Sequence, residues 1–148
     1  MRHQSRLAVL GAGHVGPVIA RLAIGAGYPV AIATSGDPDD LALIAELVAA
    51  RLPGSTVVKA LNHIGYHDLE DRARPAGAPD RRATGLAGDD PAAVAAVAEL
   101  TSRLGYDPVR LGGLRAGRML QPGGPVFGQV LTLPEFERAV HEEARSLR

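Results

Sequence analysis

Short apolar runs alternate along the chain with stretches in which apolar residues recur every three or four positions. The runs predict strands buried on both faces, and the periodic stretches predict amphipathic helices. Before residue 62, the predicted elements are strands at 7–10, 30–33 and 56–61 and helices at 15–25 and 39–52, with Asp37 as the cap of the second helix.

The segment from His63 to Asp80 differs, because it is rich in charged residues and is interrupted by prolines and glycine. We expect a long surface segment there, with one helical turn at 67–72. Regular structure then resumes. The predicted elements are strands at 82–87 and 107–111 and helices at 91–104, 114–120 and 133–147, with Asp89 or Asp90 as the cap of the first of these helices.

This alternation predicts an α/β fold with a mainly parallel, doubly wound sheet and a C-terminal helix. The length of 148 residues bounds the chain to one domain. We expect three parts within it: a βαβαβ part at 1–61, a surface or pocket segment at 62–81, and a βαβ part with the C-terminal helices at 82–148.

The composition narrows the classes of function. The 16 basic and 16 acidic residues balance, so no overall positive field favours nucleic acid or a membrane surface. The absence of cysteine excludes a disulfide framework, a thiolate metal site and a cysteine nucleophile. The apolar run near the start is too short for a signal peptide, and no stretch approaches the ~20 apolar residues of a membrane span. We therefore expect a cytoplasmic protein that acts on a small molecule.

A glycine-rich motif follows the first predicted strand. It comprises Gly11, Ala12, Gly13, His14, Val15 and Gly16, in the spacing GxGxxG. Such glycines allow a tight turn, a close approach of a pyrophosphate to the backbone, and close packing of helix on strand. The helix that begins within the motif would direct N–H groups at the anion. The motif indicates a dinucleotide-binding loop; the alternative is that the glycines serve packing alone.

The end of the second predicted strand bears on the choice of cofactor. An NAD site places an acidic residue about 20 residues after the glycines to bind the ribose hydroxyls. This chain has Thr34 and Ser35 there. Their hydroxyls suit a 2′-phosphate, so the sequence favours NADP(H) over NAD. Asp37 is a nearby ribose ligand by position, but its place before Pro38 favours a helix cap.

Polar residues cluster after the third predicted strand, at Asn62, His63, Tyr66, His67 and Asp68. We expect them at the carboxyl end of a parallel strand, where α/β proteins bind ligands. His63, His67 and Tyr66 are candidate acid–base groups, and Asn62 a candidate for orienting a substrate. The two histidines with Asp68 make a weak metal set, so we predict no metal. The alternative is a polar loop that hydrogen-bonds its own backbone.

Several arginines could either bind a ligand or be ordinary solvent-exposed residues. Arg115 and Arg118 either bind an anionic substrate or are ordinary surface arginines, the interpretation that the sequence favours. A second group, which the charge pattern assigns to a solvated face, consists of Arg72, Arg74, Arg81 and Arg82.

These segments together resemble the F420-dependent NADP oxidoreductase family. The resemblance implies a Rossmann-like fold, NADP(H) as cofactor and F420 as a hydride partner. It implies that Gly11–Gly16 is the NADP loop and that Thr34 and Ser35 contact the 2′-phosphate. The matching segments are 11–16, 33–38, 52–62, 87–90, 104–109 and 120–123.

The chain is shorter than members of that family. The resemblance implies that roughly sixty central residues, about two βαβ-sized units, are missing, so the fold would be a truncated one. Because strand edges exposed in this way need cover, we expect a homodimer, with exchanged elements as one form of it. Three functions stay open: an NADPH-linked oxidoreductase completed by dimerisation, a non-redox biosynthetic enzyme such as a cyclase, isomerase or dehydratase, and a non-catalytic binding subunit.

Overall fold

The computed structural model describes residues 7–10, 15–25, 27, 30–33 and 56–146. The predicted helix at 39–52 and its cap Asp37 lie outside the described residues, as do Gly11 to His14, Thr34 and Ser35.

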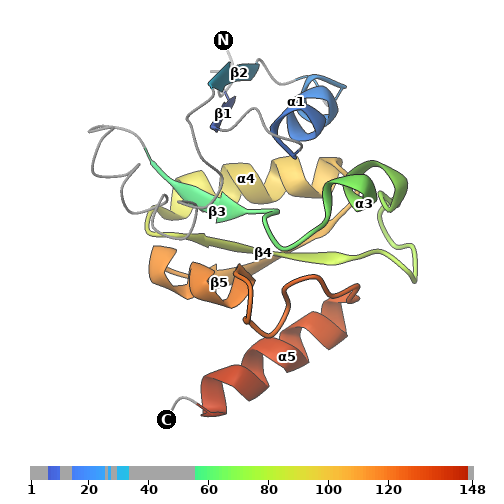
Figure 1. The fold of residues 1–148 in the computed structure, drawn as a ribbon. Coiled ribbons are helices and arrows are strands. Elements are labelled where there is room, and N and C mark those ends of the chain that lie inside the picture. Colours follow the sequence, from blue (N-terminus) through green and yellow to red (C-terminus); the bar gives the residue numbers. More distant parts are fainter. Residues whose placement is uncertain (1–6, 11–14, 26, 28–29, 34–55, 147–148) are drawn as a thin grey trace.

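The described N-terminal part consists of strand β1 (Leu7–Leu10), helix α1 (Val15–Gly25) and strand β2 (Val30–Ala33). The strands pair in parallel, with Leu7 opposite Val30 and Leu10 opposite Ala33. Figure 1 shows this part above the main sheet, on the side that carries α4 (Pro91–Arg103). The three predicted elements are confirmed.

The main described sheet has the order β3–β4–β5, from β3 (Val58–Ala60), β4 (Ala83–Gly88) and β5 (Asp107–Gly112). β4 and β5 pair in parallel, as β1 and β2 do, which agrees with the predicted mainly parallel arrangement. β3 departs from it, because it pairs antiparallel with β4. Lys59 lies opposite Ala87 in this pair.

Helices cover both faces of this sheet (Figure 1). α4 (Pro91–Arg103) lies on one face, and the 3₁₀ helix η2 (Leu114–Leu120) and α5 (Leu133–Ser146) lie on the other. Asp90 caps α4 as expected, since its carboxylate accepts a 2.6 Å hydrogen bond from the Ala93 N–H. The short helix α3 (Tyr66–Asp71) packs against α1.

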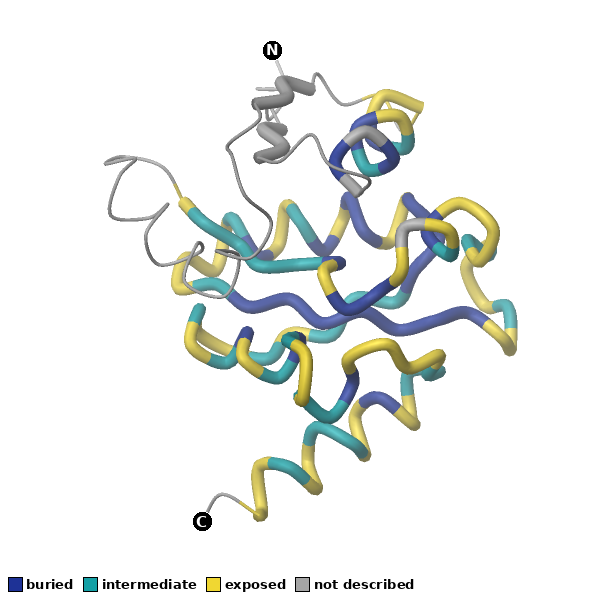
Figure 2. Tube along the Cα trace, viewed as in Figure 1, coloured by how far each residue is buried: buried dark blue, intermediate teal, exposed yellow. Residues whose placement is uncertain are grey.

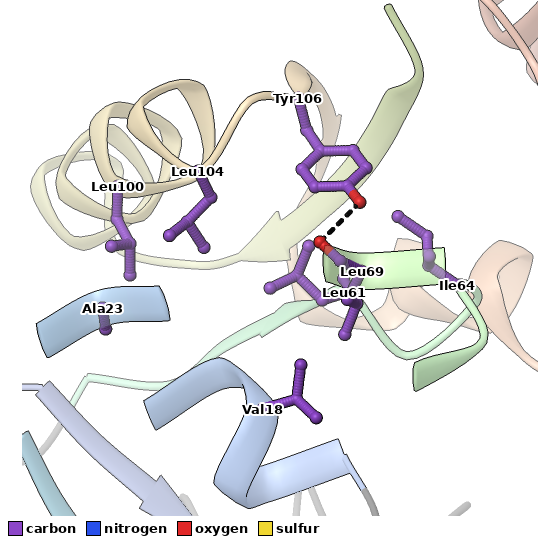
Figure 3. Close-up of a cluster of buried hydrophobic side chains, with 8 residues drawn as sticks. All are labelled: Val18, Ala23, Leu61, Ile64, Leu69, Leu100, Leu104 and Tyr106. Carbon is purple, nitrogen blue, oxygen red and sulfur yellow. Dashed lines mark hydrogen bonds between the residues drawn. The ribbon is translucent and has the colours of Figure 1, made fainter. Parts of the chain in front are cut away.

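The core has two large parts. One joins α1, α3 and α4 through Tyr106 and a group of aliphatic side chains (Figure 3). The other lies between the sheet and α5, around Phe136 and Leu120. The long central strand β4 is buried from Ala83 to Ala87 and separates these layers (Figure 2).

The predicted surface segment is wrong in part. His63, Ile64 and Leu69 are buried, and the first two lie in the turn between β3 and α3. The solvated face predicted for the arginines is also wrong at two positions, because Arg81 and Arg82 are each only 3% exposed. Both have polar partners inside the fold, which the charge pattern alone did not reveal.

Candidate functional site

The first candidate site is the junction of β1 and α1. β1 ends at Leu10 and α1 begins at Val15, so the glycine motif spans the connection between a strand and a helix. Gly16 lies in the first turn of α1 and is buried. This is the context in which glycines of this spacing bind a pyrophosphate.

The residues after β3 form the second candidate site, and their place in the sheet differs from the prediction. Because β3 runs antiparallel to β4, the turn after Ala60 lies beside the amino end of β4. The carboxyl ends of β4 and β5, where ligands usually bind in parallel sheets, lie at the opposite edge. We expected Asn62 to Asp68 at the carboxyl end of a parallel strand. That expectation is wrong, because the turn lies at the amino end of β4.

The turn after β3 has an unusual backbone. Leu61 adopts a positive φ of 63°, which a residue other than glycine rarely does. The N–H of Ile64 donates to the Leu61 carbonyl, 3.2 Å away, and closes the turn. Leu61 and Ile64 are buried in the core beside α1 (Figure 3), which holds the strained residue in place.

Asn62 and His63 point to the other core. Asn62 Nδ2 donates to the Leu120 carbonyl at 2.7 Å and so ties the end of β3 to the end of η2. The His63 ring is 2% exposed and packs at a tilt against Phe136, with ring centroids 5.7 Å apart. Of these two predicted site residues, His63 is buried and Asn62 is exposed.

The electrostatics of His63 follow from this burial. The pKa of His63 is lowered to about 4, mainly by desolvation; a backbone hydrogen bond with Ala83 raises this pKa in part, and the charge of Arg82 lowers it. Neither ring nitrogen makes a hydrogen bond of good geometry among the described residues. At neutral pH the ring is therefore neutral, and a pKa this low makes it a weak base.

His67 and Asp68 lie on α3. Unlike the buried His63, His67 is exposed and Asp68 is half-buried. Asp68 accepts a hydrogen bond from Arg82. Tyr66 begins α3, and its side chain is outside the described set. Among the residues that the structure describes, no three histidines or acidic residues gather as metal ligands would.

Two arginines that the sequence assigned to solvent organise the amino edge of β4. Arg82 donates to Asp68 Oδ2 and to the Gln129 carbonyl, each at 2.9 Å. Arg81 donates to the carbonyls of Ser102 and Tyr106, each at 2.8 Å, and its Nε lies 2.8 Å from Asp107. A buried charge needs such partners, and each arginine has several.

Lys59 is a residue whose position the sequence analysis missed. It is the only lysine of the chain. It lies in β3 on the η2 side, where its stem passes so close to Gly117 that a Cβ there would lie 2.7 Å from Lys59 Cδ. Burial lowers its pKa. The sequence signal that could have pointed to Lys59 was its rarity: of the 16 basic residues, fifteen are arginines and one is a lysine.

No helix in the described part of the chain is long and apolar enough to cross a membrane.

The fold of this chain resembles that of known solved structures. No protein-family model and no curated protein matches the chain. Among solved structures, a hypothetical protein from Sinorhizobium meliloti is 23% identical, with a TM-score of 0.65. The match covers 86% of this chain and 95% of that one.

A second solved structure comes from Arthrobacter sp. FB24, a protein that has been proposed to be an F420-dependent NADP reductase. It is 19% identical, with a TM-score of 0.61, and the match covers 86% of this chain and 99% of that one. At these identities the likeness concerns architecture. The chain has a Rossmann-like α/β fold, similar to that of these two proteins.

Proposed function

We propose that the chain binds NADP(H) and is an NADPH-linked oxidoreductase that acts on a small molecule. The observation that carries the proposal is the β1–α1–β2 unit. In it, parallel strands flank a helix, and the glycine motif stands between β1 and α1. A buried Gly16 in the first turn fits a motif that keeps the helix close to the strand.

The roles of the residues follow the order of the motif. Gly11 to Gly16 would hold the diphosphate through backbone N–H groups, and Thr34 and Ser35 would hold the 2′-phosphate. The bound nicotinamide would supply or accept the hydride. The partner of the Arthrobacter protein in its proposed activity is F420, and we include F420 as a candidate hydride partner here.

The proposal includes a homodimer that completes the site, with exchanged elements as one form of it. Within the described part of the chain, β3 and β5 are the outer strands of the main sheet, and each has one edge without a strand partner. Unpaired edges of this kind favour association with a second chain. The mass of the protein in solution tests this part of the proposal separately from cofactor binding.

The experiment for cofactor binding is a calorimetric titration of NADPH into the protein and into two glycine variants. Gly13→Ala places a methyl group where the pyrophosphate must approach the backbone, and we expect it to weaken binding at least about tenfold. Gly25→Ala is the matched control, because a Cβ at Gly25 in α1 meets no atom within 4 Å. No binding of NADPH by the parent protein, or equal binding by both variants, would contradict the proposal.

The alternative functions are a non-redox reaction that uses His63, Tyr66 or His67 as acid or base, and a non-catalytic binding subunit. The 2% exposure of His63 and its packing against Phe136 disfavour the first, because a general base must reach its substrate. Full activity in a His63→Ala, His67→Ala variant would count strongly against it.

A further inference from the structure

A group of basic side chains, separate from the glycine motif, lies on the face of the sheet that carries η2. Lys59 projects to this face from β3, and its stem lies against Gly117. Figure 1 shows η2, in orange, on this side of β3 and β4. A larger residue than glycine at 117 would occupy the path of the lysine stem.

The geometry of η2 places two arginines side by side. A 3₁₀ helix has three residues per turn, so residues three apart lie in one row. Burial follows that rule: Leu114, Gly117 and Leu120 face the sheet and are half-buried or buried. Arg115 and Arg118 form an exposed row directly after them. The row therefore directs two guanidinium groups outward, beside the residue that Lys59 contacts.

These three cations lack carboxylate partners. Among the described residues, the arginines that form ion pairs are Arg21, Arg72, Arg74, Arg81 and Arg82. The side chains of Lys59, Arg115 and Arg118 take part in no ion pair or hydrogen bond among these residues. Burial of the Lys59 stem lowers the pKa of its ammonium group, the effect of a charge that loses water without gaining a counter-ion.

The scaffold under the cations is fixed at both ends. Asp89 Oδ1 accepts from the Leu114 N–H at 2.9 Å, and Asn62 Nδ2 donates to the Leu120 carbonyl at 2.7 Å. The Asp89 carboxylate is thus engaged with the first residue of η2. A surface held in this way loses little freedom when it binds a ligand.

We propose that Lys59, Arg115 and Arg118 form an anion-binding surface for a small molecule that carries a phosphate or a carboxylate group. Arginine suits the planar oxygens of either group, and lysine adds a point charge. The surface lies on the main sheet, whereas the glycine motif belongs to the β1–α1–β2 unit. It therefore provides a place for the substrate of the proposed oxidoreductase, but its existence does not depend on dinucleotide binding.

The test is calorimetric titration with inorganic phosphate and, separately, with citrate at low ionic strength. We expect the protein to bind at least one of them, and the two probes distinguish a phosphate from a carboxylate ligand. The Arg115→Ala, Arg118→Ala variant should bind about tenfold more weakly, and added salt should weaken binding by the parent. Lys59→Met keeps the stem against Gly117 and should also weaken binding while leaving thermal stability unchanged.

The matched control is Arg138→Ala, Arg145→Ala, which removes the same charge from exposed positions of α5. It should leave the affinity unchanged. Equal loss in both double variants would mean that net charge alone attracts the anion, and no binding of either probe by the parent would mean that no site exists; either result overturns the proposal. Loss of probe binding in the Arg115→Ala, Arg118→Ala variant, with NADPH binding retained, separates this surface from the cofactor loop.

Discussion

Arg82 and Asp68 form an ion pair in which Arg82 Nη1 lies 2.9 Å from Asp68 Oδ2. The arginine side chain is 4% exposed and the aspartate side chain 37%. The pair joins the start of β4 to α3, and the same guanidinium reaches the Gln129 carbonyl before α5. One buried cation thus links three segments that lie far apart in the sequence.

Replacing Arg82 should destabilise the fold. Arg82→Met keeps most of the stem but leaves the Asp68 carboxylate and the Gln129 carbonyl without their donor. We expect a loss of about 2 kcal/mol in the free energy of unfolding, less than for a fully buried pair because Asp68 is partly solvated. Urea unfolding measures it. The exposed Arg138→Met is the control, and an equal loss there would contradict the account.

Gly85 should be intolerant of any side chain. A Cβ at this position would lie 2.5 Å from Leu120 Cδ2, 2.9 Å from Leu111 Cδ1 and 3.1 Å from Phe136 Cζ. Gly85→Ala should therefore cost about 1–3 kcal/mol by overpacking. Thermal unfolding checks this against Gly25→Ala, which meets open space in α1 and should be neutral or stabilising by up to about 1 kcal/mol. Equal stability of the two variants would show that the η2–α5 layer is not packed as described.

Stability should fall in mild acid because of His63. Its pKa is about 4 in the fold, below the ordinary value of 6.5, so the unfolded chain binds more protons between these two pH values. The stabilisation is therefore complete above the unfolded pKa and is lost as the pH falls toward 4. Between pH 7.5 and 5 the loss amounts to about 2 kcal/mol.

His63→Phe is the variant that isolates this effect. A phenyl ring can pack against Phe136 but does not titrate, so the variant should lose less stability than the parent between pH 7.5 and 5. Urea unfolding at both pH values gives the comparison. The same pH dependence in parent and variant would assign the acid sensitivity to other groups.

The sequence predicted the elements more fully than the site. Apolar runs and their spacing gave β1, α1, β4 and α4, and the Asp90 cap, because these features are local. The direction of β3 is not local. Nothing in the run 56–61 distinguishes a parallel from an antiparallel neighbour, and that direction decides which edge of the sheet receives Asn62 to Asp68.

The charged residues show the same limit. Arg81 and Arg82 stand in a stretch rich in charge, and their burial depends on partners as distant as Asp107 and Gln129. The environment of Lys59 depends on Gly117, 58 positions further on, through the contact of the stem with η2. Such pairings arise from tertiary packing, which the spacing of residues along the chain does not encode.

The proposed preference for NADP(H) over NAD(H) gives a separate prediction at Thr34 and Ser35. Thr34→Ala, Ser35→Ala should weaken NADPH binding at least about tenfold, the effect of losing hydroxyl donors to a phosphate. Binding of NADH, which lacks the 2′-phosphate, should stay as it is in the parent. Parallel titrations with the two nucleotides measure the difference. Equal weakening of NADPH and NADH binding would mean that these hydroxyl groups do not contact the 2′-phosphate.

The most direct test of the central claim is the location of bound NADPH. Amide chemical shifts of the ¹⁵N-labelled protein, followed during titration with NADPH, report which part of the chain the nucleotide contacts. The account predicts saturable changes at Gly11–Gly16 and at Thr34 and Ser35. Changes confined to residues 59 and 114–120, or no change at millimolar NADPH, would contradict it.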